Sequence, residues 1–369
     1  MEDKKILKIA VAGCGGFARG MYFPNISKTP GVKCVAVCDI VPERAQKAAE
    51  HFNIPAWYPD VQSLIKDCDF DIAIDAASIP AHHELNMALL QAGKHVISQK
   101  PAALTVEKMD EQIEAAKKAG VVFSCVPMHM IRPDILMAKD IIAAGTIGQV
   151  LSCKCVSVHG GPEYFQYRDA DPSWFYEKDA GALYDMGVHA LHQVTGIMGP
   201  AKSVYCMART MMPRRIVRSG EFDGKTIESD KLPDSYYILL DYGENRMAFI
   251  DTGFSELATR SVPLEIFGEN GVISFDSPGT TYPYPKVYID KKEMNIRGWM
   301  DPMMNVRRRP ANFTQCSCLD DMVNAVRNGT EPVLSPMHAR HVIEIMCAIP
   351  ESIQTGRAVP LKTEFRFGG

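Results

Sequence analysis

The chain has 369 residues, a formal net charge of −4 from 40 basic and 44 acidic residues, and 11 cysteines. This length exceeds what one hydrophobic core usually serves, so we expect two domains. Nearly balanced charge excludes a polycationic surface for nucleic acid or anionic membrane, and no apolar run reaches the roughly 18 residues of a membrane helix. The number of cysteines is odd and we find no secretory signal, so we expect reduced thiols and a cytoplasmic protein. The balanced charge leads us to expect a small-molecule partner.

Short apolar runs alternate with amphipathic segments in the first third of the chain. The apolar runs predict strands at residues 6–13, 32–39, 70–77, 94–101 and 120–126. Helical periodicity predicts helices at residues 42–52, 81–93 and 105–120. This order of strand, helix and strand predicts a Rossmann-type, doubly wound parallel sheet over residues 1–125.

A different pattern over residues 126–369 predicts a second α/β domain. Helices are expected at 137–145 and 181–199, and strands at 150–160, 203–210, 235–243, 246–254, 263–276 and 286–290. Strands that follow one another indicate a large, open, mainly antiparallel sheet. We expect a loop over 211–234 and a last helix over 337–356 that Pro350 kinks or ends, and we allow this helix to pack back on the first domain.

The first strand runs into a glycine-rich turn with the spacing G-x-G-x-x-A. Gly13 permits the tight turn, Gly15 lets a pyrophosphate approach the backbone, and Ala18 packs closely on the strand. Asp39 ends the second strand 21 residues after Ala18, where an acid accepts hydrogen bonds from ribose hydroxyls and repels a 2′-phosphate. We therefore predict NAD rather than NADP, and we allow for a tightly bound nucleotide. The turn residues expected at the cofactor are Gly13, Gly15, Gly16, Phe17 and Ala18.

Two alternatives apply to this turn. A glycine-rich bend also occurs without any ligand, and the motif by itself does not separate the two cases. Arg44 would weaken the preference for NAD if it turned toward the ribose, but it also fits a solvated helix residue.

Two further stretches carry groups suited to proton transfer at a hydroxyl. Lys100 follows a parallel strand and precedes Pro101, and ligands bind at the carboxyl ends of such strands. Asp185 and His189 are four residues apart on a predicted helix, where an aspartate can orient a histidine, and His192 shares their face. We predict that Lys100, Asp185 and His189 are catalytic. A surface lysine, a helix-surface ion pair and a zinc site are the alternatives, and we expect no metal because the sequence fixes no further ligand.

With these motifs the chain resembles the Gfo/Idh/MocA family of NAD(P)-dependent oxidoreductases along nearly its whole length. The resemblance rests on the glycine turn, Asp39 and four segments: SIPAHH at 78–83, GKHVISQKP at 93–101, AAGTIGQV at 143–150 and GALYDMGVH at 181–189. It implies an active site between two domains and an open sheet that often forms a dimer or tetramer contact. Lys100 matches the lysine of the E-K-P motif, and Asp185 and His189 match the D-x-x-x-H pair that surrounds the reacting hydroxyl. The cofactor set implied adds Ser78, His83, Gln99 and Lys100.

The chain departs from the family pattern on the substrate side. Gln99 replaces the usual glutamate of E-K-P, His192 stands where many relatives have aspartate, and MHMIRP at 128–133 predicts a more apolar wall. Aromatic residues at 164–176 suit a sugar ring, although a packed aromatic cluster is the alternative. The predicted substrate residues are His129, Tyr164, Arg168, Trp174 and His192. Arg214, Arg215 and Arg307–Arg309 are either an anion site or solvated charges.

These features together predict an NAD-dependent dehydrogenase. It would transfer a hydride between nicotinamide and a secondary hydroxyl or ketone of a sugar, a glycoside (for example at C3) or a cyclitol. One alternative is redox-neutral glycoside cleavage or elimination through transient sugar oxidation, and another is a non-catalytic nucleotide- or sugar-sensing protein. We expect a homo-oligomer, dimer or tetramer, formed through the sheet of the second domain, and no nucleic-acid or membrane partner.

Overall fold

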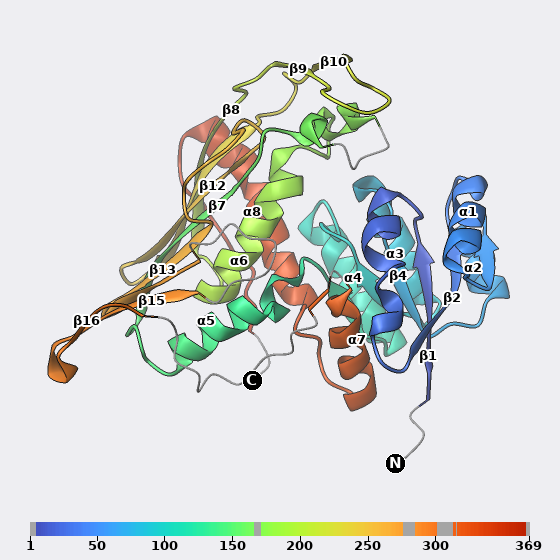
Figure 1. Ribbon diagram of the computed structural model, residues 1–369, viewed down its shortest axis with the longest axis horizontal. Helices are drawn as coiled ribbons and strands as arrows, with labels where there is room; N and C mark the ends of the chain where they lie inside the picture. The colour runs from blue at the N-terminus through green and yellow to red at the C-terminus, as the bar shows by residue number, and fades with distance from the viewer. Residues whose placement is uncertain (1–4, 166–170, 276–284, 301–312, 315, 367–369) are drawn as a thin grey trace. The chain divides into compact units, whose positions relative to one another are not determined.

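The computed structural model describes residues 5–165, 171–275, 285–300, 313–314 and 316–366 (Figure 1). The chain divides into two compact units. The first contains Met1–Met128, Phe313–Ile343 and Phe367–Gly369, and the second contains His129–Asn312 and Glu344–Arg366. The chain therefore leaves the first unit after Met128, returns to it near α7 (Ser317–Asn328), a helix that the sequence did not predict, and leaves it again after Ile343.

The first unit is built on a six-stranded sheet whose order is β3-β2-β1-β4-β5-β6. Every pairing in it is parallel, which confirms the predicted doubly wound sheet. The strands are β1 (Leu7–Ala12), β2 (Val32–Cys38), β3 (Ala56–Tyr58), β4 (Ile72–Asp75), β5 (His95–Ser98) and β6 (Phe123–Cys125). The helices between them are α1 (Pro42–Phe52), α2 (Val61–Asp67), α3 (His82–Gln91) and α4 (Val106–Ala119).

Local sequence signals explain where these elements begin and end. All four residues of β4 are buried, as expected for a strand covered on both faces. Thr105 caps α4 by accepting a hydrogen bond from the backbone N–H of Lys108, and Gly120 ends the helix with a φ of +67°. The sequence did not predict β3 or α2, because their three and seven residues are too few for a clear periodic signal.

The order of the strands reverses between β1 and β4, which lie side by side in the sheet. The chain runs outward from β1 to β3 in one direction and from β4 to β6 in the other. In open parallel sheets this reversal leaves room for a ligand beyond the carboxyl ends of the two central strands. The glycine turn follows β1 and therefore lies at these carboxyl ends.

The second unit contains a nine-stranded sheet of order β16-β15-β14-β13-β7-β12-β11-β8-β17. β7 and β12 pair in parallel and the other pairs of neighbours are antiparallel, which confirms the mainly antiparallel sheet. The strands are β7 (Val150–Val158), β8 (Ser203–Arg209), β11 (Ser235–Gly243), β12 (Arg246–Gly253), β13 (Leu264–Gly268), β14 (Gly271–Ser274), β15 (Lys286–Lys291), β16 (Ile296–Met300) and β17 (Val359–Pro360).

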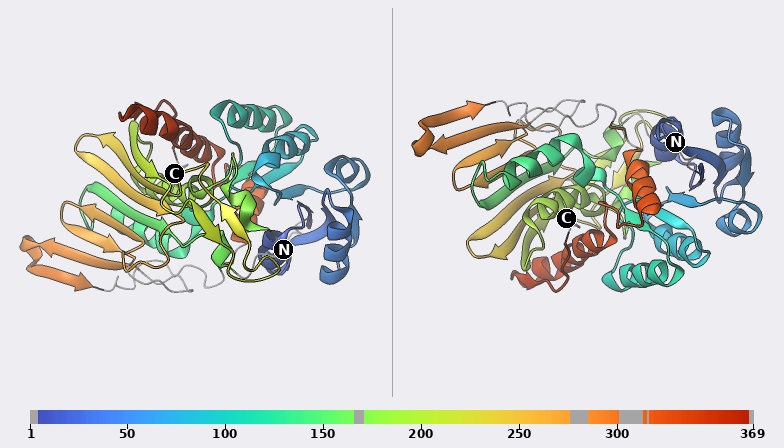
Figure 2. Two further views of the ribbon diagram at one scale, coloured as in Figure 1. Left: turned by 90° about the horizontal axis from the view of Figure 1, so that it is seen from above. Right: turned by 90° about the horizontal axis from the view of Figure 1, so that it is seen from below.

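The two faces of this sheet differ. Helices α5 (Pro133–Ala143) and α6 (Val188–Met198) lie over one face, and α6 packs on β7 and β12 (Figure 2). Strands β8, β11 and β12 alternate buried with exposed residues, so their other face is open to solvent. That second face is called the outer sheet face below.

The structure corrects the loop prediction, and of the two outcomes predicted for Pro350, a kink or an end of the helix, it excludes the end. The expected loop at 211–234 contains a short antiparallel ribbon of β9 (Arg214–Ile216) and β10 (Thr226–Glu228). Pro350 does not end α8, which runs from Pro336 to Thr355. The helix continues because Ile349 and Ser352 beside the proline are fully buried, and the Ser352 hydroxyl accepts a hydrogen bond from Cys206 and donates one to the carbonyl of Arg357. No helix among the described residues is both long and apolar enough to cross a membrane.

Candidate active site

The glycine turn folds tightly against the end of β4. Gly13 has a φ of +99°, and a Cβ built on it would lie 2.6 Å from the backbone carbonyl of Ala76. A Cβ on Gly15 would meet no atom within 4 Å. Gly13 is thus required by the fold, whereas Gly15 opens backbone to a ligand, as a pyrophosphate site needs. Among the other turn residues, Ala18 is fully buried, and Gly16 and Phe17 are exposed.

Asp39 is fixed at the edge of the sheet by the turn itself. Its Oδ2 accepts a hydrogen bond of 2.8 Å from the backbone N–H of Cys14, and its Oδ1 accepts one of 2.9 Å from that of Val41. Each oxygen keeps a second lone pair, so the carboxylate can still accept hydrogen bonds from a ribose. Burial, with the nearby Asp39 charge, raises the pKa of the Cys14 thiol to about 12, so this cysteine remains protonated.

Lys100 follows β5 in a loop whose start is hydrogen-bonded to the ends of both neighbouring strands, β4 and β6. It is half-buried and precedes Pro101 across a cis peptide bond. The backbone N–H of Gln99 donates to the carbonyl of Asp75 at 3.0 Å, and that of Val126 donates to the carbonyl of Ser98 at 3.1 Å. The side chain of Gln99, which stands where the family has glutamate, donates to the hydroxyl of Tyr22.

Three other predicted cofactor residues lie at the surface of the first unit. Ser78 is exposed in the loop that follows β4, and Arg44 is exposed near the start of α1. His83 is half-buried on α3, and its Nε2 lies 3.1 Å from a carboxylate oxygen of Glu111 on α4. The role of these three residues in nucleotide binding remains a prediction.

In the second unit His189 lies at the start of α6 and belongs to a series of hydrogen-bonded side chains. Its Nδ1 lies 3.0 Å from Nε2 of His129, and Nδ1 of His129 accepts a hydrogen bond of 3.1 Å from the Arg132 guanidinium. Arg132 in turn pairs with the buried carboxylate of Asp134 at the start of α5. His129 was predicted as a substrate residue, and both of its ring nitrogens have partners within this unit.

Asp185 and His192 lie on either side of His189 along the chain. Asp185 belongs to a π-helical turn, Leu183–Gly187, that leads directly into α6. His192 is 5% exposed, and its Nδ1 lies 2.8 Å from the carbonyl oxygen of Val188, so Nδ1 carries a proton. Among the described residues no group of three or more His, Cys, Asp or Glu side chains has the arrangement of a metal site.

Family comparisons identify the two units. Residues 7–126 match the oxidoreductase family with an NAD-binding Rossmann fold, and residues 135–274 match the GFO/IDH/MocA C-terminal domain. The chain belongs to the Gfo/Idh/MocA family. It is an NAD-dependent oxidoreductase of the type that acts on CH–OH groups, as the sequence predicted, and the turn and Asp39 provide a site that fits NAD.

The relatives of this Gfo/Idh/MocA protein include several named dehydrogenases. Levoglucosan dehydrogenase from Pseudarthrobacter phenanthrenivorans is 28% identical over 271 residues, which are 71% of this chain and 66% of that protein. Myo-inositol 2-dehydrogenase from Thermotoga maritima is 22% identical over 96% of this chain and 99% of its own length. D-glucoside 3-dehydrogenase from Escherichia coli is 24% identical over 96% and 97%, respectively.

Solved structures show the same fold for this family member. A levoglucosan dehydrogenase in complex with NADH and L-sorbose superposes with a TM-score of 0.82 at 21% identity, over 97% of this chain and 99% of that one. An oxidoreductase from Agrobacterium radiobacter in complex with NAD+, L-tartaric acid and magnesium gives a TM-score of 0.77 at 21% identity, over 96% and 98%.

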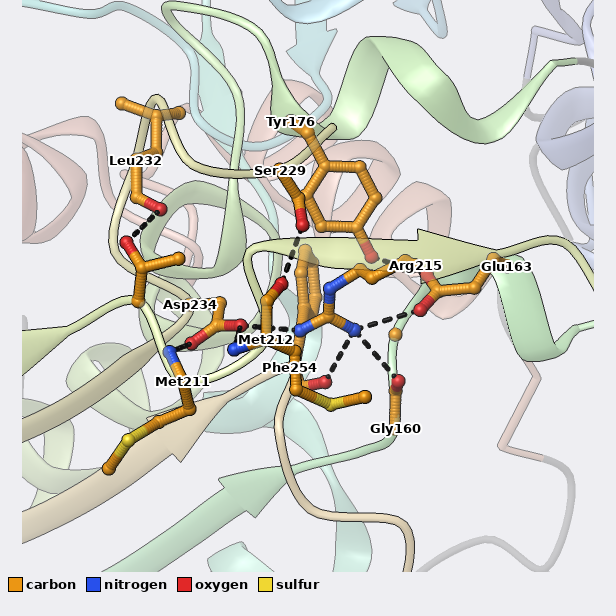
Figure 3. A network of polar contacts seen from close by, with 12 residues as sticks. Gly160, Glu163, Tyr176, Met211, Met212, Arg215, Ser229, Leu232, Asp234 and Phe254 are labelled. Atoms are coloured by element: carbon orange, nitrogen blue, oxygen red, sulfur yellow. Dashed lines mark hydrogen bonds and ion pairs between the residues drawn. The ribbon is translucent and has the colours of Figure 1, made fainter. Parts of the chain in front are cut away.

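The aromatic stretch of this family member includes Tyr176, which lies against a buried arginine. Arg215 is fully enclosed, and its guanidinium donates to carboxylate oxygens of Glu163 at 2.8 Å and Asp234 at 2.6 Å (Figure 3). Tyr176 donates its hydroxyl to Glu163 and places its ring 5.1 Å from the guanidinium carbon. Figure 3 shows that the carbonyl oxygens of Gly160 and Phe254 also accept from Arg215, so this network ties three loops together.

Arg215 fits neither of the two interpretations predicted for the arginines, an anion site or solvated charges. Arg215 neutralises internal carboxylates and is enclosed, so it does not offer an anion site, while Arg214 is exposed. Tyr176 is buried in a packed cluster with Phe254, whereas Trp174 keeps 40% of its surface exposed. The Tyr164 hydroxyl is buried without a hydrogen-bond partner in the described parts of the chain. Arg168 and Arg307–Arg309 lie outside the described residues.

Sequence reasoning missed two buried networks beneath the carboxyl edge of the first sheet. Asp75 ends β4, and its Oδ2 lies 2.7 Å from Nδ1 of His82, with both side chains at most 1% exposed. Asn86 donates to Ser98 and to Gln112 at 2.8 Å each, and Gln112 donates to the carbonyl of Ala102 at 3.1 Å. The second network fixes the backbone on both sides of Lys100. Asp75 had a usable signal, since like Asp39 it is an acid that ends an apolar strand.

Proposed function

We propose that this protein is a dehydrogenase that oxidises a secondary hydroxyl of a sugar, glycoside or cyclitol, or reduces the corresponding ketone. The observation that carries this proposal is the pairing of an NAD turn in the first unit with a hydrogen-bonded histidine, His189, in the second. Relatives over nearly the whole chain are named for myo-inositol and D-glucoside oxidation, which supports a polyhydroxylated ring as substrate.

The proposed division of roles follows the chemistry of carbinol oxidation. NAD, when bound, accepts the hydride or returns it. Lys100 and His189 stabilise the oxygen that loses its proton, and Asp185 supports the pair electrostatically. Trp174 and Tyr164 offer aromatic faces to the apolar CH side of a sugar ring.

The test is a substrate panel with purified protein and NAD. Levoglucosan, myo-inositol, methyl glucosides and xylose are incubated with the enzyme, and NADH is followed by its absorbance. The His189→Ala and Lys100→Met variants should each lower kcat/KM by about 100-fold or more, since positioned proton-transfer groups contribute that much. The proposal fails if no substrate yields NADH or if both variants match the wild type.

Two controls complete this test. Some enzymes retain the nucleotide through turnover, so the supernatant of denatured protein is also examined for NAD and NADH. Release of a sugar or an aglycone without stoichiometric NADH would favour transient oxidation over net dehydrogenation.

We also propose that a second copy of the chain covers the outer sheet face. Large side chains on it remain 43–64% exposed, namely Met207, Tyr237, Leu239, Met247 and Trp299. Nine strands set about 4.8 Å apart and about six residues long present roughly 900 Å². A stable interface needs about 800 Å² from each partner, so this face is large enough for a homodimer contact.

A further inference from the structure

The side chains around His189 determine which of its nitrogens carries the proton. Arg132 lies 3.1 Å from Nδ1 of His129, and an arginine side chain only donates hydrogen bonds. Nδ1 of His129 must therefore accept, which leaves the proton of the neutral ring on Nε2. That Nε2 lies 3.0 Å from Nδ1 of His189, so His129 donates to His189. Nδ1 of His189 then accepts, and its own proton resides on Nε2.

Arg132, the first donor of this series, is fixed by two contacts with Asp134. The Arg132 Nε donates to Asp134 at 3.1 Å, and a second guanidinium nitrogen pairs with the other carboxylate oxygen. Asp134 is 2% exposed and also accepts a hydrogen bond from the backbone N–H of Ile135. Because this fork uses the Nε and one terminal nitrogen, Arg132 is oriented to present its other terminal nitrogen to His129.

The same geometry opposes the other protonation states. A proton added to Nδ1 of His189 would face the N–H of His129, so two donors would point at each other across 3.0 Å. His129 could relieve this only by moving its own proton to Nδ1, where it would face the Arg132 guanidinium.

We propose that Arg132 and His129 are positioning residues that hold His189 as the Nε2–H tautomer, and that His189 therefore donates a hydrogen bond to the substrate oxygen and does not act as the base. This inference rests on the proposed function, which assigns the substrate oxygen to Lys100 and His189 jointly. It gives each of the two residues a separate role. In the oxidation the Lys100 amine would take up the hydroxyl proton, and NAD, when bound, would supply the acceptor for the hydride of the carbon–hydrogen bond that breaks. The Nε2–H of His189 stabilises the alkoxide that develops.

The tautomer can be measured without substrate or cofactor. Protein labelled with 15N in its histidine rings gives NMR shifts that distinguish Nε2–H, Nδ1–H and imidazolium, and His189→Gln and His192→Gln identify the two signals. We expect Nε2–H for His189 and Nδ1–H for His192, whose Nδ1 faces a carbonyl oxygen and serves as the internal control. An Nδ1–H tautomer or an imidazolium at His189 near neutral pH would overturn the proposal.

Two matched variants of His129 test the relay itself. In His129→Gln an amide N–H can still donate to His189, so the Nε2–H tautomer should persist. In His129→Glu a carboxylate replaces the donor, so His189 should move its proton to Nδ1. Arg132→Lys keeps a cationic donor and should behave as the wild type. It is the control for Arg132→Gln, whose shorter side chain could also impair folding. If His129→Gln and His129→Glu leave the same tautomer, His129 does not set it.

Kinetics with a substrate from the panel give a separate answer. His189→Gln keeps an N–H donor and should retain kcat/KM within about 10-fold, whereas His189→Leu should lose about 100-fold or more. A histidine that acted as the base would make the two variants equally poor. Absence of any substrate would remove the dehydrogenase proposal but leave the NMR result intact, so the two failures are distinguishable.

Discussion

At the scale of single residues, Asp39 and Gly13 belong both to the contacts that hold the fold and to the proposed cofactor site. The Asp39 carboxylate accepts backbone N–H groups from the glycine turn and from the start of α1, so it orders the turn before any nucleotide arrives. Gly13 brings the same turn against β4. A change at either residue should therefore affect stability and NAD affinity together.

Gly13→Ala should be more destabilising than Gly93→Ala, although both glycines have positive φ. Gly93 has a φ of +74° with open space around its Cβ position, so an alanine there meets only backbone strain of about 1–2 kcal/mol. At Gly13 a methyl group would also lie 2.6 Å from backbone of Ala76, and the total loss should reach about 3 kcal/mol or more. Urea unfolding of both variants measures the difference, and equal losses would show that the contact with Ala76 relaxes at little cost.

At the scale of elements, the Arg215 network holds together segments that have little regular structure. Its carboxylates come from the turn at Glu163 and from the loop before β11, and its arginine lies on the three-residue strand β9. Loops of this kind carry few backbone hydrogen bonds of their own, so a buried ion pair with several acceptors can define their positions.

The adjacent residues Arg214 and Arg215 provide a matched pair of substitutions. Arg215→Ala leaves Glu163 and Asp234 as uncompensated buried charges, so it should lower the free energy of unfolding by about 3–5 kcal/mol. Arg214 is 70% exposed and lies 3.7 Å from Glu228, so Arg214→Ala should change stability by less than about 0.5 kcal/mol. Thermal and urea unfolding compare the two. A mild effect of Arg215→Ala would mean that water or a loop rearrangement compensates the carboxylates.

The outer sheet face gives a second prediction at this scale. Leu239 and Met247 are 44% and 64% exposed on neighbouring strands, so Leu239→Lys or Met247→Lys should disrupt a homodimer by placing charge in an apolar contact. Light scattering after size exclusion should show a dimer or tetramer for the wild type and a smaller species for the variants. Ile40→Lys, which changes an 89% exposed residue in the first unit, is the control. A monomeric wild type would contradict the proposal.

At the scale of the whole molecule, periodicity predicted the sheets better than the site. Long apolar or alternating runs such as those of β1, β7 and β11 carry their own signal, so both sheets were predictable. The ribbon of β9 and β10 and the continuation of α8 past Pro350 depend on buried partners distant in sequence, Arg215 with Asp234 and Ser352 with Cys206. His129 gave no sign of its contact with His189, 60 residues away, because only the fold brings them together.

The pH dependence of stability is a property of the whole molecule. The contribution of one carboxyl group, that of Asp251, can be measured separately. Burial, together with the like charge of Glu256, raises the pKa of Asp251 from 3.8 to about 6. One of its oxygens, Oδ1, is buried without a hydrogen-bond partner among the described residues. Since the folded state binds this proton more tightly than the unfolded state, the contribution of Asp251 to stability is favourable at low pH and is lost as pH rises from about 4 to about 7.

Asp251→Asn removes this titration while keeping the shape of the side chain. The variant should be more stable than the wild type by about 1–2 kcal/mol at pH 8, and the advantage should shrink to nearly zero at pH 4. Glu256→Gln removes only the neighbouring charge, so it should give a smaller gain with the same dependence on pH. Denaturant unfolding of the three proteins between pH 4 and pH 8 supplies the measurement. A stability difference that stays constant across this range would mean that Asp251 titrates alike in the folded and unfolded chains, and that the asparagine acts through packing alone.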